Sequence, residues 1–592
     1  MIQPHRALAG SSPVHPPGAV DVAAADPDRR IQVTVVLKRP RLPNDHPALV
    51  KAKAYGAAWP TERSPMGIAE FTALYAPPAA VVRAILGIAR KEGLTIVDVS
   101  AARHDVVLEG PIGAFDRACR IRQREYQHEL GRYRAHGGPI KLPGQVAALV
   151  EGVLGLDTIP HARPHARPAR PGSRSLTPAE IAKLYRFPPA TRGAGRIAVL
   201  EFGGGIHAED LRALARTAPI RVLEITDGAG ESPGNSPVDG PTLLAIRRDW
   251  RSGMTFEQLA AKYGTRFQSF MDTVEATMDA QIVCSLMPDT AVDLVFSPPS
   301  ADGWRRAIYA EIGLPYPGSV SGPASRSRKP ASVISCSWGM AESSWGRMKL
   351  RVLHGTIKAA GRRGATVCCS TGDFGSRNSP RPSPKRSVNY PATSTWSLAC
   401  GGLSFRDDER GRCEVTWLES LLGTNMAGGG GMSGHFPKPP FQAGVSAPKP
   451  GDTWLAGTRR SFKGRWIPDV AAHAGFDPGV AMSLLGKPFV GGGTSAATPI
   501  WAALVARLSA QVGRPLGWLT PALYQLAESG AFRDIREGHN DLAVKRGKPV
   551  YYRATIGWDA CTGLGAPDGT ALLEGLRKGP SEIGNGKSAV GN

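Results

Sequence analysis

The feature that most constrains the fold is a series of short, almost wholly apolar runs, separated by helical patterns, in the second part of the chain. Strands that are buried on both faces have this pattern, because helices cover both sides of a parallel sheet. From Leu176 onward we therefore predict an α/β domain with a parallel sheet. The expected strands cover residues 197–202, 292–296, 333–335 and 365–370. In such sheets, functional residues lie where strands end and helices or loops begin.

The first part of the chain has a different pattern. Strand patterns at residues 31–37, 94–99 and 105–108 alternate with helical patterns at residues 78–90 and 113–118. This order predicts a small α+β domain that ends near Leu156. A tract rich in Pro and Arg follows it. Because this composition cannot form a core, we predict an extended, accessible linker that is a natural cleavage site.

Composition narrows the class of protein. No stretch approaches the roughly 20 apolar residues of a membrane helix, and residues 1–30 show no ordinary secretory signal. The chain has 72 Lys and Arg against 50 Asp and Glu, a net charge of +22, but these residues are spread out rather than gathered in runs. That spread disfavours a nucleic-acid partner, and the net charge would keep the protein soluble by charge repulsion. The eight cysteines show no zinc-ligand spacing, and the redox compartment stays open.

A glycine-rich turn precedes the most informative serine. Gly491-Gly492-Gly493-Thr494-Ser495 is followed by Pro499 and an apolar helical run. The glycines allow a tight turn, so Ser495 is expected at a helix start, where free N–H groups and the helix dipole can stabilise an oxyanion. A serine at this place is either a helix cap or a nucleophile, and the long apolar helix favours the nucleophile.

A nucleophilic serine needs a base. The Asp-His-Ser order of subtilisin-type enzymes would use Asp227 and His354, but His354 falls inside an amphipathic helical stretch, where catalytic histidines are uncommon. The alternative is the pair Glu275 and Asp279, which four-residue spacing places on one helix face. Such a pair is either a solvated acidic face or two carboxyl groups that share a proton. A third carboxylate, Asp373, follows a buried strand between two glycines, where it either caps the turn or approaches a ligand.

These carboxylates and Ser495, taken in order, resemble the sedolisin family of serine-carboxyl peptidases, and kumamolisin-like members in particular. The resemblance covers nearly everything from Leu176 to Leu576 and, more loosely, the part before it. Further motifs that carry it are residues 176–178, 200–205, 335–339, 400–402, 467–470 and 557–565. The family implies a subtilisin-like α/β fold and a serine endopeptidase that acts in acid.

The resemblance also implies a role for each matching residue. Ser495 would be the nucleophile, Glu275 the general base and acid, and Asp279 the group that orients Glu275. Asp373 would be a protonated donor in the oxyanion hole, and Glu201 and Trp338 would extend the hydrogen-bond network. A glutamate suits acid chemistry because it is about half ionised near pH ~4, where a histidine is fully protonated.

Other implications concern substrate, metal and processing. The backbone of Ser337 and Gly339, and the glycines Gly428 and Gly429, would flank an extended peptide substrate by β-type pairing. One structural Ca²⁺ would bind oxygen atoms of Asp534, Ile535, Thr555, Gly557 and Asp559. Thr555 stands where the family usually has glycine, but only its carbonyl is needed. Asn389, neutral where the family commonly has Asp, weakens any expectation of a basic side chain next to the cut.

The predicted organisation follows from these points. It is a disordered N-terminus (1–29), a ferredoxin-like activation propeptide (30–157), a cleavable linker (158–175), a peptidase domain (176–578) and a disordered tail (579–592). The propeptide would be an intramolecular inhibitor of a secreted, monomeric enzyme that acts on proteins and peptides.

Residues 240–270 replace a short acidic loop of the family. They predict two short helices joined by a Gly turn, which is typical of a surface helical hairpin near the active-site entrance and, less so, of a DNA-reading helix-turn-helix.

Overall fold

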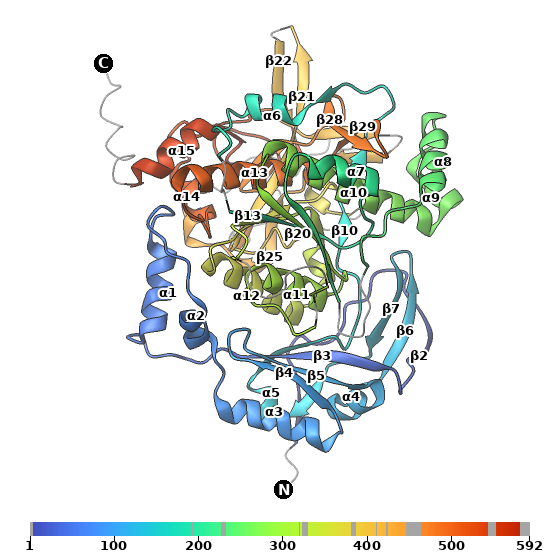
Figure 1. The fold of residues 1–592 in the computed structure, drawn as a ribbon, viewed down its shortest axis with the longest axis vertical. Helices are drawn as coiled ribbons and strands as arrows, with labels where there is room; N and C mark the ends of the chain where they lie inside the picture. Colours follow the sequence, from blue (N-terminus) through green and yellow to red (C-terminus); the bar gives the residue numbers. More distant parts are fainter. Residues whose placement is uncertain are drawn as a thin grey trace.

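The computed structural model describes residues 4–191, 195–226, 233–318, 320–321, 329–379, 386–409, 411–421, 424–445, 463–542 and 552–580. Two domains lie one above the other in Figure 1: a smaller N-terminal domain, drawn in blue, and a larger domain that contains the rest of the chain. Within the described residues, no single helix is both long and apolar enough to cross a membrane, and α2 (Ile68–Tyr75) and α3 (Ala79–Lys91) pass that test only as a pair bent by 77°.

The large domain is built on the parallel sheet that the sequence predicts. Its central strands run in the order β14-β15-β13-β17-β19-β21, all parallel, with β27 added beside β21. The strands are β14 (Ile220–Ile225), β15 (Ala291–Phe296), β13 (Arg196–Glu201), β17 (Val333–Cys336), β19 (Thr366–Ser370), β21 (Ser397–Asp408) and β27 (Val470–His473). The α/β fold with a subtilisin-like parallel sheet is therefore confirmed.

Both faces of this sheet are buried, as the apolar runs require. Alternate residues of β13 belong to two different apolar clusters: Ile197 and Val199 pack with α10 (Thr265–Leu286) and α13 (Thr494–Val512). Ala198 and Leu200 pack in the cluster of α11 (Ala301–Glu311) and α12 (Arg347–Arg362). Successive strand residues point to opposite faces, so helices on both sides explain why residues 197–200 are all apolar.

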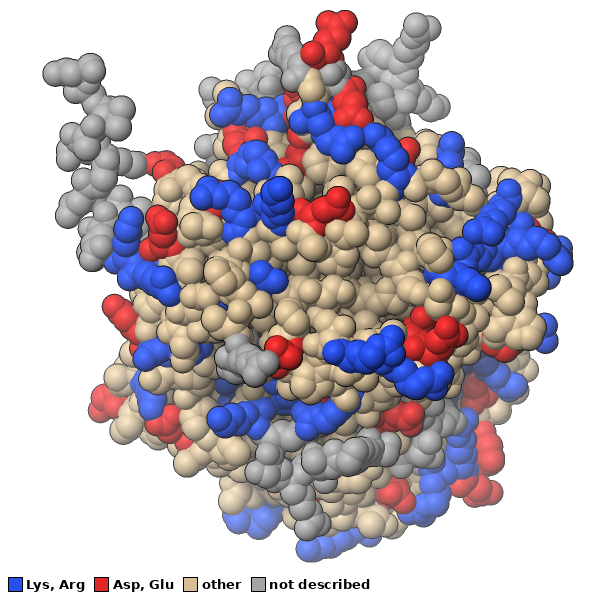
Figure 2. Space-filling view, turned by 45° about the horizontal axis from the view of Figure 1, so that its top comes forward, with Lys and Arg blue, Asp and Glu red and all other residues tan. Residues whose placement is uncertain are grey.

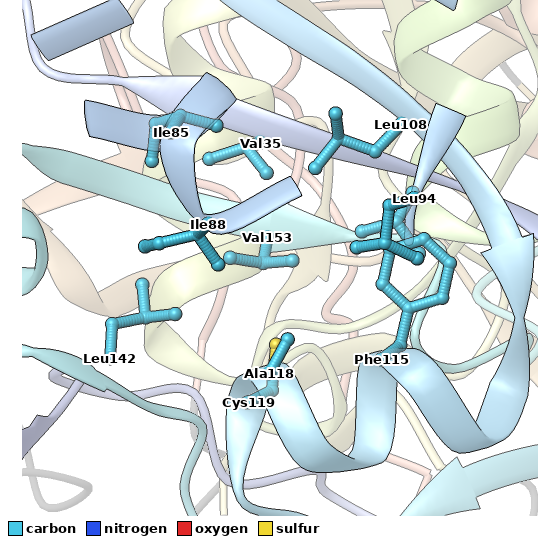
Figure 3. Close-up of a pocket in the computed structure, with 11 residues that line it drawn as sticks. Val35, Ile85, Ile88, Leu94, Leu108, Phe115, Ala118, Cys119, Leu142 and Val153 are labelled. Atoms are coloured by element: carbon cyan, nitrogen blue, oxygen red, sulfur yellow. The ribbon is translucent and has the colours of Figure 1, made fainter. Parts of the chain in front are cut away.

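The N-terminal domain has a four-stranded antiparallel sheet in the order β4-β5-β3-β9. These strands are β4 (Thr95–Ser100), β5 (Asp105–Pro111), β3 (Arg30–Leu37) and β9 (Val150–Leu154). The helices α3 and α4 (Ile112–Cys119) pack on one face. This is the expected α+β propeptide domain, and its core encloses an apolar cavity of about 30 Å³ (Figure 3).

The prediction of a disordered N-terminus differs from what the structure shows. Residues His5–Ala7 form β1, which pairs with β8 (Lys141–Pro143), and Val20–Ala24 form β2, which pairs with β6 (Gln123–His128). Pairing at the edge of a sheet satisfies the backbone N–H and C=O groups of a segment that has no apolar core of its own. The polar composition of this segment therefore did not indicate that it forms strands. At the other end, α15 (Gly569–Lys578) closes the domain, and residues 581–592 lie outside the described part of the chain.

The N-terminal domain covers the outer face of α11 and α12 through buried contacts of opposite charge. Arg305 of α11 donates to Asp105 of β5 at 2.9 Å, and both side chains are buried. Lys349 of α12 donates to Asp157 at 2.6 Å. Because one domain supplies the acid and the other the base in each pair, these contacts hold the two domains together.

The linker is extended, as predicted, but only its end is accessible: residues 170–172 and 174–175 are exposed, whereas most of residues 158–169 are buried. Its short strands β10 (Arg163–Pro164), β11 (Arg167–Pro168) and β12 (Ser175–Leu176) pair with strands of the large domain. His161, His165 and Ala166 are each less than 5% exposed. The accessibility expected from composition is therefore wrong for the tract before Arg170, because that tract pairs with existing strands and is covered by the large domain.

The predicted helical insertion is present as α8 (Gly240–Arg251) and α9 (Phe256–Tyr263), a hairpin at the right of Figure 1. Trp250 anchors it, with its ring 5.9 Å from that of Phe489. Its exposed cations form a local basic group at the right edge of Figure 2, whereas elsewhere on that face basic and acidic side chains are interspersed.

Candidate active site

Ser495 lies in the first turn of α13, as the glycine-rich turn predicts. Gly493, just before the helix, has φ +108°, a conformation that only glycine adopts readily. A Cβ at Gly493 would lie 2.1 Å from the carbonyl oxygen of His165. Ser495 is fully buried, and its hydroxyl oxygen lies 3.3 Å from the carbonyl oxygen of Ser337. The turn therefore brings the serine and the linker backbone close together.

The carboxyl groups of α10 lie beside this serine. Burial and the charge of Asp279 raise the pKa of Glu275 well above its usual value, while hydrogen bonds from Ser495 and from the Ala166 N–H oppose that rise. Burial and the charge of Glu201 likewise raise the pKa of Asp279. Both side chains are fully buried, so the pair is not a solvated acidic face.

Glu201 extends this row of carboxyl groups from the end of β13. The indole Nε1 of Trp338, on β18 (Trp338–Ala341), donates to Glu201 Oε2 at 2.8 Å. Burial and the charge of Glu275 raise the pKa of Glu201 well above its usual value. Three neighbouring carboxyl groups that are fully buried cannot all be ionised. This row of carboxyl groups therefore retains at least one proton near neutral pH.

Asp373 reaches the same site from the loop after β19. Its Oδ1 accepts hydrogen bonds from the Thr494 N–H at 2.9 Å and the Thr494 hydroxyl at 2.8 Å. Its Oδ2 is buried and, within the described residues, has no hydrogen-bond partner. Burial raises the pKa of Asp373 to about 7, although Arg167 and Thr494 act in the opposite direction. Below pH 7 this carboxyl group is therefore mainly neutral and can donate a proton in a hydrogen bond.

The linker crosses the site between these groups. The Ala166 N–H donates to Glu275 Oε2 at 2.5 Å. On the other side of the same peptide bond, the carbonyl oxygen of His165 and Asp373 Oδ2 both lie within 3 Å of the point where a Cβ at Gly493 would be. The His165–Ala166 bond thus has its nitrogen at Glu275 and its oxygen on the side of Asp373.

Strands of the large domain hold the linker on both sides of this bond. Arg163 pairs antiparallel with Gly339, and Arg167 pairs antiparallel with Gly492 of β29 (Lys487–Gly492). The Ala169 N–H adds a hydrogen bond to Val490 at 2.8 Å. An extended peptide bound in this way gains affinity from backbone pairing and specificity from its side chains.

Of the expected peptide-flanking residues, Ser337 and Gly339 lie at the linker, whereas Gly428 and Gly429 take another position. The N–H of Gly428 donates to Trp417, and the N–H of Gly429 donates to Gly372 at 2.7 Å. A Cβ at Gly429 would lie 1.9 Å from the carbonyl oxygen of Thr371. These two glycines therefore let a strand pack closely against the Asp373 loop, and among the described contacts they make no hydrogen bond to the linker.

Sequence reasoning missed Ser370 and His165. The imidazole Nδ1 of His165 lies 2.7 Å from Ser370 Oγ, and both side chains are buried. A signal was present in the sequence, because His-Ala-Arg-Pro occurs twice in succession, at residues 161–164 and 165–168.

His354, the alternative base, lies elsewhere. It sits on α12, where its Nδ1 is 3.0 Å from Ser394 Oγ and its ring lies 5.0 Å from that of Phe436. Burial and nearby positive charges lower its pKa to about 3. None of its described contacts is with Ser495, and Asp227 lies outside the described residues.

The candidate calcium ligands gather at one loop. The Gly557 N–H donates to Asp534 Oδ2 at 3.2 Å, and the Thr555 N–H donates to Asp559 Oδ2 at 3.1 Å. Burial raises the pKa of Asp559 to about 7. Asp534 also pairs with Arg536 at 2.8 Å. No group of three or more His, Cys, Asp or Glu in the described ranges is arranged for a metal.

Comparison with known proteins agrees with this architecture. Residues 17–159 match the family described as "Pro-kumamolisin, activation domain", and residues 306–526 match the "Subtilase family". Kumamolisin of Bacillus sp. strain MN-32 is 32% identical over 593 residues, which is 97% of each chain. Sedolisin of Pseudomonas sp. strain 101 is 25% identical over 86% of this chain and 81% of its own.

A solved structure of Pseudomonas sedolisin, a serine-carboxyl proteinase in complex with pseudo-iodotyrostatin, shares the fold. It has a TM-score of 0.50 and 22% identity, and it covers 69% of this chain and 100% of its own. With a similar relative along almost its whole length, and an activation domain ahead of a subtilisin-like domain, the chain belongs to the sedolisin family of serine-carboxyl peptidases as a kumamolisin-like precursor.

Proposed function

We propose that this peptidase is an acid-active endopeptidase, made as a zymogen that cuts its own linker at His165–Ala166. The observation that carries the proposal is the orientation of that bond. Its carbonyl oxygen faces the region of Asp373 Oδ2, and its nitrogen lies 2.5 Å from Glu275 Oε2. Hydrolysis requires this polarity, because negative charge develops on the oxygen and a proton must reach the nitrogen.

Acylation would begin at the Ser495 hydroxyl. Its oxygen attacks the carbonyl carbon of His165 while its proton passes to ionised Glu275. The charge that develops on the carbonyl oxygen is stabilised by neutral Asp373 and by the N-terminus of α13. The carbon–nitrogen bond then breaks, and Glu275 gives the proton to the Ala166 nitrogen, which leaves as the new amino terminus.

Deacylation would reverse these roles. Water attacks the ester that joins His165 to Ser495, and Glu275 takes one of its protons. The ester bond to Ser495 Oγ breaks, Glu275 returns the proton to that oxygen, and the free carboxyl group of His165 is released. Asp279 and Glu201 orient Glu275 and hold the shared proton within the row of carboxyl groups.

Two carboxyl groups set the pH range. Asp373 must be protonated to donate, so activity falls as the pH rises through about 7, the value to which burial raises its pKa. Glu275 must be ionised to accept the serine proton, so activity falls at the acid end. Once the linker leaves, water reaches Glu275 and lowers its pKa toward the ordinary value of about 4.3. Because both requirements must be met at once, the activity is highest at acid pH.

The test is a pH profile together with identification of the cut bond. We expect the purified precursor to yield a chain that begins at Ala166 on acidification, and the processed enzyme to hydrolyse an unstructured polypeptide with a maximum below pH 7. Ser495→Ala should stay unprocessed. Mass spectrometry that finds another first cut, or a maximum above pH 8, would contradict the proposal.

A histidine-dependent enzyme is the alternative that this experiment can also address. Glu275→Gln should lower kcat by at least 10²-fold, the usual worth of a general base. His354→Gln should retain kcat, because its described contacts are with Ser394 and Phe436. The opposite pattern would favour the subtilisin-type mechanism.

We also propose one structural Ca²⁺, held by Asp534, Asp559 and the carbonyls of Ile535, Thr555 and Gly557. The support is that a buried carboxylate, Asp559, faces the same loop as Asp534 with only N–H and O–H donors as its described hydrogen-bond partners. Thermal unfolding of the Ser495→Ala precursor should shift to lower temperature in a chelator and recover with added Ca²⁺. An unchanged Tm would contradict the site, and Asp559→Asn should abolish the response.

The remaining proposals concern location and assembly. We propose that the enzyme is secreted and monomeric, that proteins are its substrates, and that the propeptide inhibits it until cleavage. The buried linker in the site supports the inhibition. Activity in the culture medium and a monomer mass in solution would agree with the first two points.

A further inference from the structure

The side chain that precedes the proposed cleavage point is held in a closed polar pocket. His165 is 4% exposed, and its Nδ1 lies 2.7 Å from Ser370 Oγ. Ser370 is fully buried at the end of β19. Its hydroxyl also lies 2.9 Å from the carbonyl oxygen of Ser337, which can only accept a hydrogen bond. Ser370 therefore donates its one proton to Ser337.

The direction of the second hydrogen bond follows from this assignment. With its proton used, Ser370 Oγ presents a lone pair to the imidazole, so His165 Nδ1 must carry the hydrogen and donate. Behind Ser370, the amide of Asn389 donates to the Ser370 carbonyl oxygen at 2.9 Å, and Asn378 donates to Asn389 at 3.2 Å. Among the described residues, the hydrogen-bond partners of Ser370 and of Asn389 behind it are thus uncharged, and none is a carboxylate.

We infer that Ser370 is a specificity-determining residue, and that the mature enzyme prefers peptide bonds that follow a neutral histidine. The inference rests on the proposed function, because it treats the linker as a bound substrate. A neutral imidazole matches these groups in both respects: it donates from Nδ1 to a fixed acceptor, and it brings no charge beside Ser370, whose described hydrogen-bond partners carry none. Phe offers no donor, and Lys would bury an unpaired ammonium group.

The groups around His165 agree with a neutral ring. Arg163 and Arg167 flank it along the linker, and burial together with these charges lowers its pKa to about 3. Glu275 and Asp373 approach from α10 and from the loop after β19, and burial favours their protonated forms. Arg167 bonds mainly to the linker itself, through the carbonyl oxygens of Pro164 and Ala166. The neighbouring arginine is therefore a poorer candidate for selection by the enzyme.

The tandem repeat gives the inference a consequence within this chain. His161-Ala162-Arg163-Pro164 has the same residues as the four that begin at His165. In the precursor His161 is stacked on Trp345, with ring centroids 4.4 Å apart, and is held away from Ser370. After the first cut, the His161–Ala162 bond is a second bond of the preferred type, and its hydrolysis would release the tetrapeptide Ala162–His165.

The experiment compares peptides that differ only in the residue before the cut. Processed enzyme is given Ala-Arg-Pro-X-Ala-Arg-Pro-Ala with X as His, Gln, Phe or Lys, and kcat/KM is measured from pH 4.5 to 6.5. We expect the His peptide to be preferred over Phe at pH 6 by at least tenfold. Ser370→Ala should reduce that ratio by about tenfold, the value of one buried hydrogen bond. The matched control is Ser397→Ala, another buried serine that donates to a backbone carbonyl, and it should leave the ratio unchanged.

The pH dependence of the peptide preference separates recognition of a neutral histidine from a merely structural role of Ser370, which would not change with pH. A free-peptide histidine has a pKa of about 6.5 and must lose its proton to bind, so the His-to-Gln ratio of kcat/KM should rise up to tenfold per pH unit from 4.5 toward 6.5. Equal cleavage of the His and Phe peptides, a preference that survives Ser370→Ala, or a flat ratio would each overturn the inference while leaving the peptidase intact. Failure to cut any peptide, or an unstructured polypeptide, would overturn the proposed function and the inference together.

Discussion

Acidification should lower the free energy of unfolding of the precursor, because the folded chain keeps several histidines neutral. His161 is the best placed of these histidines to test this. Its ring lies against Trp345, and its Nε2 is 3.0 Å from the ammonium Nζ of Lys349. That nitrogen can only accept from Lys349, because a protonated ring would place two cations in contact. Burial and Lys349 lower the pKa of His161 well below its usual value, with Asp157 acting in the opposite direction.

The sign and size follow from proton linkage. The unfolded chain takes up a proton on His161 below pH ~6.5 and the folded chain does not, so the free energy of unfolding falls as the pH falls. For a ring that stays neutral in the fold, the loss between pH 7.0 and 5.5 is about 1.3 kcal/mol. His161→Gln keeps an acceptor for Lys349 without titrating, so this part of the pH dependence should disappear.

The assay is urea unfolding of the Ser495→Ala precursor at pH 7.0 and 5.5, with and without His161→Gln. The difference between the two pH values should be smaller by about 1.3 kcal/mol in the His161→Gln protein. Asp157→Asn is the control: its carboxylate pairs with Lys349, and its pKa is lowered in the fold. The stabilising effect of the Asp157 carboxylate is thus lost only below pH 5.5, so Asp157→Asn should lower the free energy of unfolding equally at pH 7.0 and at pH 5.5. The same pH dependence with and without His161 would refute the reasoning.

Three further predictions concern other parts of the molecule. Asp373→Asn should lower kcat/KM by about 10²-fold, because the oxyanion donor changes, and it should remove the fall in activity near pH 7; a profile that keeps this fall would show that another group causes it. Asp105→Ala leaves the buried Arg305 without its carboxylate, and should cost about 3–5 kcal/mol in urea unfolding of the Ser495→Ala precursor; a loss under 1 kcal/mol would mean that Arg305 finds another partner. Val153→Ile adds one methylene to the cavity in Figure 3 and should raise the stability of the precursor by about 0.8 kcal/mol, whereas a lower Tm would show that the cavity cannot take the added group.

Local patterns in the sequence predicted a good part of the fold. The apolar runs gave the parallel sheet because period and composition are properties of a few neighbouring residues, and β13 (Arg196–Glu201) is completely buried, as its run implies. The four-residue spacing of Glu275 and Asp279 likewise placed both on one face of α10. The pairing of β1 and β2 was not predictable, because it depends on strands 100 or more residues away.

The linker shows most clearly what local patterns cannot give. Its proline and arginine content correctly indicated an extended chain, but accessibility depends on what surrounds a segment, and strands β18 and β29 of the other domain surround it. The same limit applies to His165 and Ser370, which are 205 residues apart in sequence and 2.7 Å apart in space.

By itself, the sequence determined which chemical groups are present and what local structure carries them: a serine at a helix start, carboxyl groups one helical turn apart, and an aspartate after a buried strand. Only the tertiary structure decided that these groups meet around one peptide bond of the linker, and that burial raises the pKa of Asp373 and lowers the pKa of His165. The physical reason is that helix and strand formation depend on neighbours along the chain, whereas proton affinity and contact depend on neighbours in space.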